Sequence, residues 1–599
     1  MDLTAILDEI VHVPRPIRKG AALALGFEKA QRLYTSLKIQ APTQSIQEGL
    51  LQQLAVTYRV GERDIQQVPK SGPVLVVANH PFGILEGAVL AAVLGRVRPD
   101  VRFLANDILS TIPEVHDLLI PVDPTGGASA ARRNVTGVRR SIEFLERGGC
   151  LVVFPAGEVS HFHLRQATVT DPEWHTAVSR MIETLSRRGV AVSALPVYLG
   201  GANSFVFQTL GLLHSRLRTL LLVRELLNKR NRLVELRIGS LISSKKLLEI
   251  PTPEERTEYL RWRTYLLANR PDYKARTSVP LVGRSRRSPQ PVRPSSEKAL
   301  LCQEIATLSA DQILAKTGDL DVHIAPARLI PAVLEEIGRL RELTFRAVGE
   351  GTGKSTDLDR FDSEYLHLFA WHAGKSEIVG AYRLAGTDQT KDLYTAMLFK
   401  YGDAFLQKMG PALELGRSFV RPEYQRGFAP LLALWKGIGA YISRNPRYRV
   451  LFGPVSISNR YQAVSRELMV SFLERHASLG EWMGLVSNRN AFRKRRRAPG
   501  LPSVGPGFGM DAKDLSDVVS DLEPSRTGIP VLLHQYLKLG GRLLGFNVDP
   551  EFSDTLDGLI VVDLLKTERR LLEGYLGKEE SAVFLGYQKE TQWHIAKRS

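Results

Sequence analysis

The chain has 599 residues, which is too long for one compact core, so we expect two or more domains. A hydrophobic content of 44% is typical of globular domains, and the presence of only two cysteines argues against a disulfide framework and for a reducing compartment. The formal net charge of +17 favours an acidic partner and leaves nucleic acid, an anionic bilayer and an acidic carrier protein as alternatives.

Residues 1–60 have a helical pattern, because Phe27, Ala30, Tyr34 and Leu37 recur at spacings that form one face. A packing helix and an interfacial membrane helix both fit this pattern, so we expect a helical segment that can associate with a membrane. The first residues lack the cationic start and apolar centre of a signal peptide, which predicts a cytoplasmic protein.

Between residues 61 and 269, short apolar runs alternate with helical patterns, which predicts an α/β domain. The uncharged stretch 189–215 is long enough to cross a bilayer, but Pro196 and Gly200 argue against a helix. We expect a buried strand there, followed by an apolar segment at 205–213 that can rest against a membrane. The strands predicted for this domain are residues 74–78, 151–154 and 191–198.

Residues 270–298 combine several prolines with arginines and serines, which predicts an extended, mobile linker. We expect a second α/β domain with a C-terminal extension at 299–599. A basic run at 489–497 and a Gly/Pro-rich loop at 499–509 divide this domain. Its predicted strands are 377–384, 413–420 and 558–564, and its predicted helices are 429–444 and 531–544.

The first chemical motif follows the expected strand 74–78 and reads Asn79-His80-Pro81-Phe82-Gly83-Ile84-Leu85-Glu86-Gly87. It resembles the signature of the lysophospholipid acyltransferase family, and the resemblance covers about residues 70–250. It implies that His80 removes a proton from an acceptor hydroxyl as that hydroxyl attacks an acyl thioester, while Glu86 fixes the imidazole tautomer. The family has Asp five positions after its histidine. Glu86 stands six positions after His80, so the pair has to meet across a turn.

Later blocks of the same family also differ here. Residues 119–123 lack the arginine that contacts a glycerol phosphate, which implies an acceptor other than lysophosphatidic acid. The segment Phe-Pro-Ala-Gly-Glu at 154–158 is similar to the family's Phe-Pro-Glu-Gly acceptor motif, and a structural turn explains it equally well. The substrate-binding residues implied by this similarity are Phe154, Pro155, Gly157 and Glu158.

The second chemical region, about residues 335–480, resembles the branch of the GCN5-related fold that includes acyl-homoserine lactone synthases and ornithine N-acyltransferases. The matching elements are Phe345-Arg346, Asp359-Arg360-Phe361-Asp362, Ala381-Tyr382-Arg383 and Glu414-Leu415-Gly416-Arg417-Ser418. The resemblance implies that Arg346, Asp359, Asp362, Arg383 and Arg417 line the substrate site. A structural salt-bridge network is the competing explanation.

Amide formation needs a group that accepts a proton from the attacking amine, and Glu414 is our candidate base. On a regular strand Glu414 and Arg417 point to opposite faces, so a bulge or a strand end is needed to bring them together. Gly427 and Ala429 match the end of the fold's phosphate loop, which predicts that backbone N–H groups at the start of helix 429–444 bind phosphopantetheine.

The two regions in this order resemble the bifunctional ornithine lipid synthases over nearly the whole chain, including residues 534–540. The resemblance implies that the C-terminal domain transfers a 3-hydroxyacyl group from acyl carrier protein to the α-amine of an amino acid. Ornithine is the first candidate, and glycine, lysine and glutamine are alternatives. The N-terminal domain then esterifies the new hydroxyl of the lyso-lipid.

The same resemblance implies acyl carrier protein as donor and partner, no bound cofactor, and peripheral association with the anionic inner face of the cytoplasmic membrane. We expect no metal, because His161 and His163 have no cysteines or clustered carboxylates at ligand spacing. A single N-acyltransferase with a degenerate first domain is the nearest alternative. A pore-forming haemolysin lacks support without an export signal, and the basic run lacks the aromatics of a nucleic-acid site.

Overall fold

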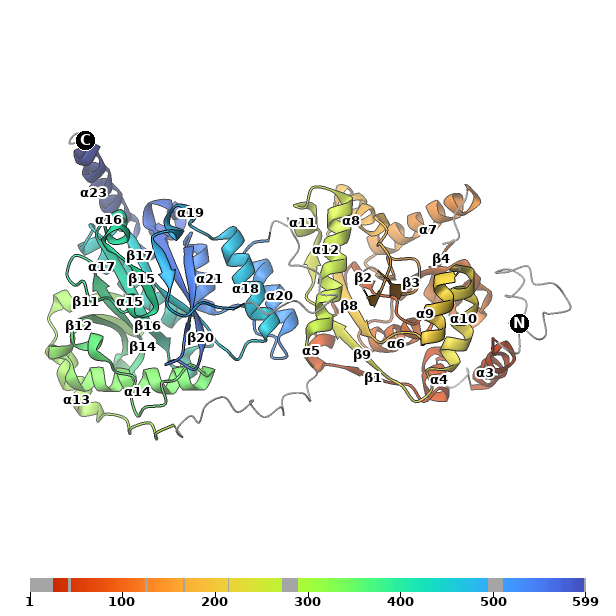
Figure 1. Cartoon of the computed structure of the whole chain (residues 1–599), viewed down its shortest axis with the longest axis horizontal. Helices are drawn as coiled ribbons and strands as arrows, with labels where there is room; N and C mark the ends of the chain where they lie inside the picture. Colours follow the sequence, from red (N-terminus) through yellow and green to blue (C-terminus); the bar gives the residue numbers. More distant parts are fainter. Residues whose placement is uncertain are drawn as a thin grey trace. The chain divides into compact units, whose positions relative to one another are not determined.

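The computed structural model describes residues 25–40, 45–123, 128–164, 167–213, 215–271, 289–493 and 510–596. The described residues form two compact units (Figure 1). The first unit contains the residues up to 271 together with 510–511 and 520–527, and the second contains 289–493, 512–519 and 528–596. Most of the predicted linker, residues 272–288, lies outside the described residues, as do residues 1–24.

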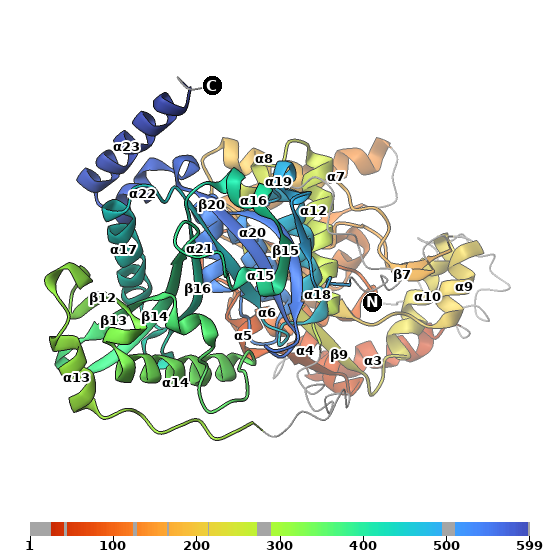
Figure 2. The ribbon, with the colours of Figure 1, turned by 60° about the vertical axis from the view of Figure 1, so that its left-hand side comes forward.

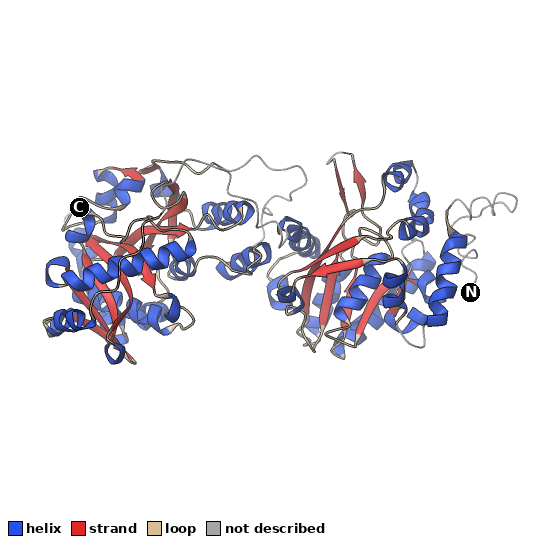
Figure 3. Ribbon diagram, turned by 90° about the horizontal axis from the view of Figure 1, so that it is seen from below, coloured by secondary structure: helices blue, strands red, loops and turns tan. Residues whose placement is uncertain are grey.

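The first unit is built on a mixed sheet, for which the described residues supply eight strands. The strand order is β1-β9-β8-β2-β5-β3-β4, with β10 paired to β8. β2 lies at its centre, parallel to both neighbours, and its five apolar residues are all buried. Helices cover both faces of the sheet (Figure 3). The strand bounds are β1 Thr57–Val60, β2 Val74–Ala78, β3 Val101–Asn106, β4 Leu119–Val122, β5 Cys150–Val153, β8 Ser193–Gly200, β9 Leu233–Ile238 and β10 Ile242–Ser243, with a separate hairpin of β6 His161–His163 and β7 Thr168–Thr170.

Helix α3 of the first unit buries the face that the sequence predicts. Phe27, Ala30, Tyr34 and Leu37 of α3 are all buried, so the packing interpretation of this helix is confirmed. Across the described residues, every helix is too short or too polar to cross a bilayer. The helix bounds are α3 Phe27–Gln40, α4 Ile46–Gln53, α5 Glu62–Ile65, α6 Leu85–Leu94, α7 Ala128–Glu146, α8 Ala177–Arg187, α9 Phe205–Leu213, α10 Ser215–Leu227, α11 Ser244–Leu248 and α12 Pro253–Leu266.

The second unit also has a sheet of eight strands among its described residues, in the order β11-β12-β13-β14-β16-β17-β20-β19. Its neighbours are antiparallel except for β16 and β17, which pair in parallel only from Ala412 to Glu414. Beyond that point the two strands separate. The bounds are β11 Ile313–Thr317, β12 Leu320–Pro326, β13 Leu366–His372, β14 Glu377–Gly386, β16 Ala412–Val420, β17 Val450–Ile457, β19 Arg542–Asp549 and β20 Thr555–Asp563, with a small pair of β15 Phe399–Tyr401 and β18 Val486–Asn488.

The helices α14 and α17 of the second unit lie against this sheet. α17 spans Ala429–Arg444, as predicted, and packs against α22 and α23 (Figure 2). The other helix bounds are α13 Lys298–Ala306, α14 Pro331–Val348, α15 Thr395–Leu398, α16 Asp403–Met409, α18 Ala463–His476, α19 Gly480–Met483, α20 Ala512–Leu522, α21 Val531–Lys538, α22 Arg569–Leu576 and α23 Lys578–Ala596.

Two expectations about the C-terminal part were wrong. The predicted helix 531–544 ends at Lys538, because Gly540 adopts a left-handed conformation (φ +83°) and the chain then enters β19. Residues 520–527 belong to the first unit, although the sequence placed everything after 299 in the second domain. There Asp521 pairs with Arg263 at 2.8 Å and Arg526 pairs with Asp64 at 2.5 Å.

Candidate active sites

The first site is built on the turn between β2 and α6. The side chain of Asn79 accepts a hydrogen bond from the backbone N–H of Leu199 (2.7 Å) and donates one to its carbonyl (2.9 Å), which fixes the end of β2 to β8. The backbone N–H groups of Phe82 and Gly83 then donate to Oε1 of Glu86, at 2.9 and 2.7 Å. Gly83 has φ +102°, a conformation that residues with a side chain rarely adopt.

This turn brings His80 and Glu86 together. His80 Nδ1 lies 2.7 Å from Glu86 Oε1, and the Glu86 side chain is fully buried. The imidazole stacks on the Phe154 ring with centroids 4.4 Å apart. Because Nδ1 faces the carboxylate, Nε2 is the nitrogen left to contact an acceptor hydroxyl. The six-residue spacing is accommodated because the chain folds back before α6 begins.

Asp171 is a second acidic group at this site, and the sequence did not reveal it. Its Oδ1 accepts the backbone N–H of His80 (3.1 Å) and the Ser160 hydroxyl (2.5 Å), and its Oδ2 accepts the Trp174 indole N–H (2.9 Å). Asp171 stands outside the four family blocks, so only its burial in the structure identifies it.

The charges around His80 favour its protonated form. Burial alone lowers the pKa of the imidazole, but the Glu86 and Asp171 carboxylates outweigh it and raise the pKa above its usual value. For Glu86 the directions are reversed. Burial raises the pKa of this carboxyl, but His80 and the N–H of Gly83 bring the pKa below its usual value. The carboxylate can therefore stabilise an imidazolium that forms during proton transfer.

The predicted acceptor segment contributes one direct contact to this site. Phe154 stacks on His80, and the Pro155 carbonyl accepts the N–H of His175 (2.9 Å). Gly157 adopts φ +66° and forms the turn. The Glu158 side chain is half exposed and pairs with Arg218 of α10 at 2.8 Å.

In the second unit, most of the predicted charged residues form one connected network. Asp359 accepts from Arg383 (2.6 Å) and from Arg417 (3.1 Å). Asp362 lies 3.2 Å from Arg383 and 2.7 Å from Arg341. Burial raises the pKa of Asp362, but the two arginines beside it hold that pKa well below its usual value. Four of the five predicted substrate-binding residues therefore belong to one cluster.

Arg346 is the predicted residue that the structure leaves outside this cluster. It donates to Oε1 of Glu342 at 3.0 and 2.7 Å and to the carbonyls of Gln290 and Lys354. Arg341, one helical turn before Phe345 in α14, is completely buried. Through its contact with Asp362 it occupies the position in the network that the sequence had assigned to Arg346. A charged residue on the apolar face of a predicted helix is the signal that could have identified it.

A β-bulge solves the orientation problem of β16. Arg383 pairs with Gly416 and Ala381 with Phe419, so two residues of β16 stand opposite Tyr382. Arg417, one of those two, has φ +48°. Its guanidinium lies over the ring of Tyr394 (4.7 Å), the residue whose backbone N–H donates to Glu414 (3.2 Å). The bulge thus brings Glu414 and Arg417 to the same side.

The carboxylate of Glu414 already has donors on both oxygens. Oε1 accepts the N–H of Thr395 (2.7 Å), and Oε2 accepts the N–H of Tyr394 and the Tyr365 hydroxyl. The residue is 1% exposed. In this arrangement Glu414 holds the segment 394–395 over the site.

The predicted phosphate loop lies at the open start of α17. Gly427 and Ala429 are exposed, and an added Cβ on Gly427 would meet no heavy atom within 4 Å. α17 begins without a side-chain cap. Backbone N–H groups at such a helix start are suited to a phosphate.

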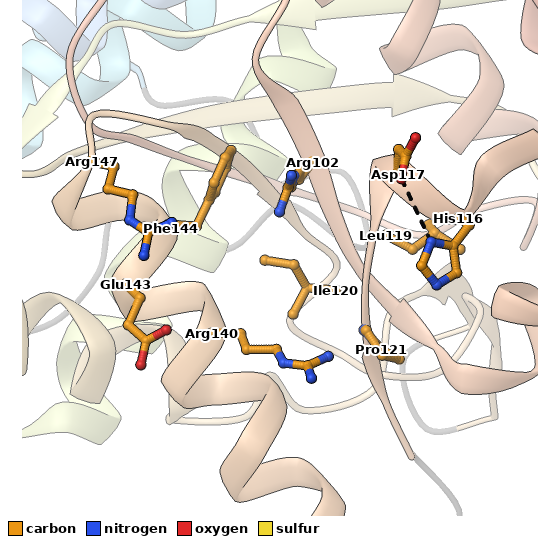
Figure 4. Close-up of a pocket in the computed structure, with 10 residues that line it drawn as sticks. All are labelled: Arg102, His116, Asp117, Leu119, Ile120, Pro121, Arg140, Glu143, Phe144 and Arg147. Atoms are coloured by element: carbon orange, nitrogen blue, oxygen red, sulfur yellow. Dashed lines mark ion pairs between the residues drawn. The ribbon is translucent and has the colours of Figure 1, made fainter.

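A basic surface pocket lies apart from the predicted site residues, between β3, β4 and α7 (Figure 4). Arg102, Arg140 and Arg147 line it, with Arg102 4.9 Å from the centre of the Phe144 ring. Leu119, Ile120 and Pro121, from the block that lacks the phosphate-binding arginine, form its apolar wall.

Comparison with known proteins finds a family match in each half of the chain. Residues 33–274 match a family model described as Acyltransferase, and residues 340–436 match one described as Acetyltransferase (GNAT) domain. A glycine N(alpha)-acyltransferase of Bacteroides thetaiotaomicron is 32% identical over 305 residues, which cover 47% of this chain and 88% of the relative.

Two further relatives have related names. A lyso-glycine lipid O-acyltransferase of Phocaeicola vulgatus is 29% identical over 222 residues, covering 35% of this chain and 73% of the relative. An L-ornithine N(alpha)-acyltransferase of Brucella abortus is 28% identical over 286 residues, covering 44% and 91%. The chain therefore belongs to the family of acyltransferases that these relatives represent, and it joins an Acyltransferase domain and a GNAT domain in one polypeptide.

Proposed function

We propose that this chain makes an aminolipid in two acylations. The GNAT domain transfers a 3-hydroxyacyl group from acyl carrier protein to the α-amine of an amino acid. The Acyltransferase domain then esterifies the hydroxyl of the resulting lyso-lipid. Relatives named for glycine and for ornithine support either amino acid as acceptor.

The observation that carries this proposal is the His80–Glu86 contact at 2.7 Å. Burying a charged carboxylate costs free energy, and the cost rises if its partner is lost. A first domain that had lost its activity would not be expected to retain such a carboxylate beside an imidazole. The contact favours an active O-acyltransferase site over the alternative of a single N-acyltransferase.

In the O-acylation step, Nε2 of His80 takes the proton of the lyso-lipid hydroxyl as the oxygen attacks the thioester carbonyl. Glu86 holds Nδ1 and stabilises the cation that forms. A C–O bond is made, the C–S bond breaks, and the imidazolium returns its proton to the departing thiolate, which leaves as a thiol. No step requires a bound cofactor or metal.

The proposed function also includes acyl carrier protein as the acyl donor and peripheral binding of the chain to a membrane. Three arginines around the pocket of Figure 4 and the charge of +17 suit an acidic carrier protein or an anionic bilayer. Phe205, at the start of α9, is 81% exposed, and Leu164, at the tip of the β6–β7 hairpin that α9 contacts, is 73% exposed. These side chains support peripheral binding to the inner face of the cytoplasmic membrane.

The direct test incubates the purified full chain with 3-hydroxyacyl carrier protein, acyl carrier protein loaded with a second fatty acid, and single amino acids. We expect N-acylated amino acid with the first donor and diacylated product once the second is added. Failure to acylate any amino acid would refute the first step, and a product that stops at the lyso-lipid would favour the single-activity alternative.

A further inference from the structure

Three features on one face of the second unit's sheet bear on how an amine could bind there. Ser456 of β17 stands directly opposite Asp557 of β20 and donates to its Oδ1 at 2.7 Å. Phe452, four residues before Ser456, pairs with Glu414. Because side chains alternate along strands, Glu414 and Asp557 lie on the same face.

A second acidic residue lies beside Asp557. Asp549 of β19 pairs with Thr555, two residues from Asp557, so both carboxylates face the same way. Asp557 is 4% exposed and Asp549 is 5% exposed. Buried carboxylates without a fully paired cation favour a ligand that brings positive charge.

Arg417 provides the opposite charge next to this pair. Its guanidinium lies between the rings of Tyr394 (4.7 Å) and Phe552 (4.2 Å), and Phe552 stands in the loop that joins β19 to β20. The Arg417 side chain is 9% exposed, and its Nε makes no hydrogen bond. Asp357 Oδ2, 3.5 Å from that Nε, is also without a hydrogen bond. The two atoms form an ion pair with each other, but neither makes a hydrogen bond, which leaves both able to bond to a polar group of a ligand.

There is space for such a group. Gly416 precedes Arg417 and lies on the Glu414 face, and an added Cβ there would meet no heavy atom within 4 Å. This is also where β16 and β17 have separated, since their pairing ends at Glu414.

We propose that this face binds the amino acid acceptor as a zwitterion, with Arg417 on its carboxylate, and that Asp557 removes the proton from its ammonium group. This inference rests on the proposed N-acylation. Asp549 adds negative charge that attracts the ammonium. Glu414, whose oxygens are all occupied, positions Tyr394 instead of acting as the base.

The chemistry balances with these groups alone. Asp557 takes one proton from the ammonium, and the free amine attacks the thioester carbonyl. A C–N bond forms, the C–S bond breaks, and the thiolate leaves with the second proton of the amine. The groups that act on Asp557 are Ser456, Asp549, Glu350 and Arg417. Burial is the largest influence and raises the pKa of Asp557 to about 7, which suits a base near neutral pH.

The test compares Asp557→Asn, Asp549→Asn and the unchanged full chain in N-acylation across pH. At pH 7 the Asp557→Asn chain should lose about 100- to 10,000-fold in kcat. It should regain activity as the pH rises toward the pKa of the amine, because the free amine then needs no base. Asp549→Asn should mainly raise the KM for the amino acid. Urea unfolding of the same samples reports whether the second unit, which contains both substituted residues, is correctly folded.

Substrate changes test the carboxylate contact. The unchanged chain should use the C-terminal amide of its amino acid roughly 10- to 100-fold less efficiently than the acid, because the charged hydrogen bonds to Arg417 are lost. Full activity of Asp557→Asn at pH 7, or a loss that high pH does not restore, would overturn the role of Asp557. If the unchanged chain acylates no amino acid, the proposed function itself fails.

Discussion

Nδ1 of His80 lies 2.7 Å from Oε1 of Glu86, although six positions separate the residues in the chain. Two backbone N–H groups of the intervening turn bind the same carboxylate oxygen. The carboxylate therefore fixes both the turn and the imidazole. Because both residues belong to the proposed O-acylation site, changes at either should affect O-acylation and leave N-acylation unchanged.

Replacing His80 with alanine should abolish O-acylation selectively. We expect a loss of about 100- to 10,000-fold, because the hydroxyl then has no general base. N-acylation by the same protein should stay at its original rate. His163→Ala is the matched control, since that histidine lies on the β6–β7 hairpin and bonds the Thr170 carbonyl. Radioactive acyl transfer to a synthetic lyso-lipid measures the effect, and an active His80→Ala chain would exclude the dyad.

Glu86→Gln should move the pH profile of O-acylation. His80 acts as a base only when it is neutral, so activity falls as the pH drops through its pKa. Burial lowers that pKa and the carboxylates raise it, so removal of the Glu86 charge should shift the acidic limb of kcat/KM to lower pH. The maximal rate should also fall, because the imidazole tautomer is no longer held. An acidic limb at an unchanged pH would mean that His80 does not control it.

Arg341→Met and Arg346→Ala should differ in their effect on stability, because Arg341 belongs to the charged network of the second site and Arg346 lies outside it. Arg341→Met leaves the buried Asp362 without one of its two arginines and should destabilise the second unit by about 3–5 kcal/mol. Arg346 is 30% exposed at its side chain, and its buried partner Glu342 keeps donors from Thr352 and Gly353, so Arg346→Ala should destabilise the unit less than Arg341→Met and keep N-acylation within a few-fold. Urea unfolding and amino acid acylation check both. Loss of acylation in stable Arg346→Ala protein would restore this residue to the substrate site.

Glu414→Gln should reduce N-acylation through the position of Tyr394. Glutamine keeps one acceptor but loses the charge that binds three donors, so segment 394–395 should become less ordered. Unlike Asp557→Asn, this variant should not recover at high pH. Tyr365→Phe, which removes one of the three donors, is the milder control. Recovery of Glu414→Gln at high pH would instead favour Glu414 as the base.

Phe205→Asp should weaken binding to vesicles that contain anionic lipid. The residue is one of the most exposed apolar side chains described, so folding should not depend on it. Val583→Asp is the matched control, because Val583 is 63% exposed on α23 in the second unit. Co-sedimentation with vesicles measures the difference. Equal binding by both variants would place the membrane contact elsewhere.

The sequence predicted most of the scaffold because its signals are local. The run Val74–Ala78 is apolar throughout and forms the central strand, and α17 begins and ends at the predicted residues. The packing of segments that contact residues far away in the sequence was less predictable. Residues 520–527 pack in the first unit through Asp521 and Arg526, whose partners are more than two hundred positions away in sequence.

In the candidate sites, only the residues that belong to a sequence motif could be predicted. His80 and Glu86 belong to a contiguous motif, and the sequence predicted either a bulge or a strand end near Arg417, of which the structure has the bulge. Asp171 and Asp557 carry no motif of their own. Their roles depend on burial and on side chains brought from other strands, which only the folded structure provides.

The central claim is that one chain performs both acylations. Lipid mass spectrometry of a host without aminolipids, expressing either the unchanged chain or its His80→Ala form, tests it most directly. We predict the diacylated aminolipid from the unchanged chain and accumulation of the monoacylated lyso form from His80→Ala. Diacylated lipid in the His80→Ala host, or no aminolipid from the unchanged chain, would contradict the account.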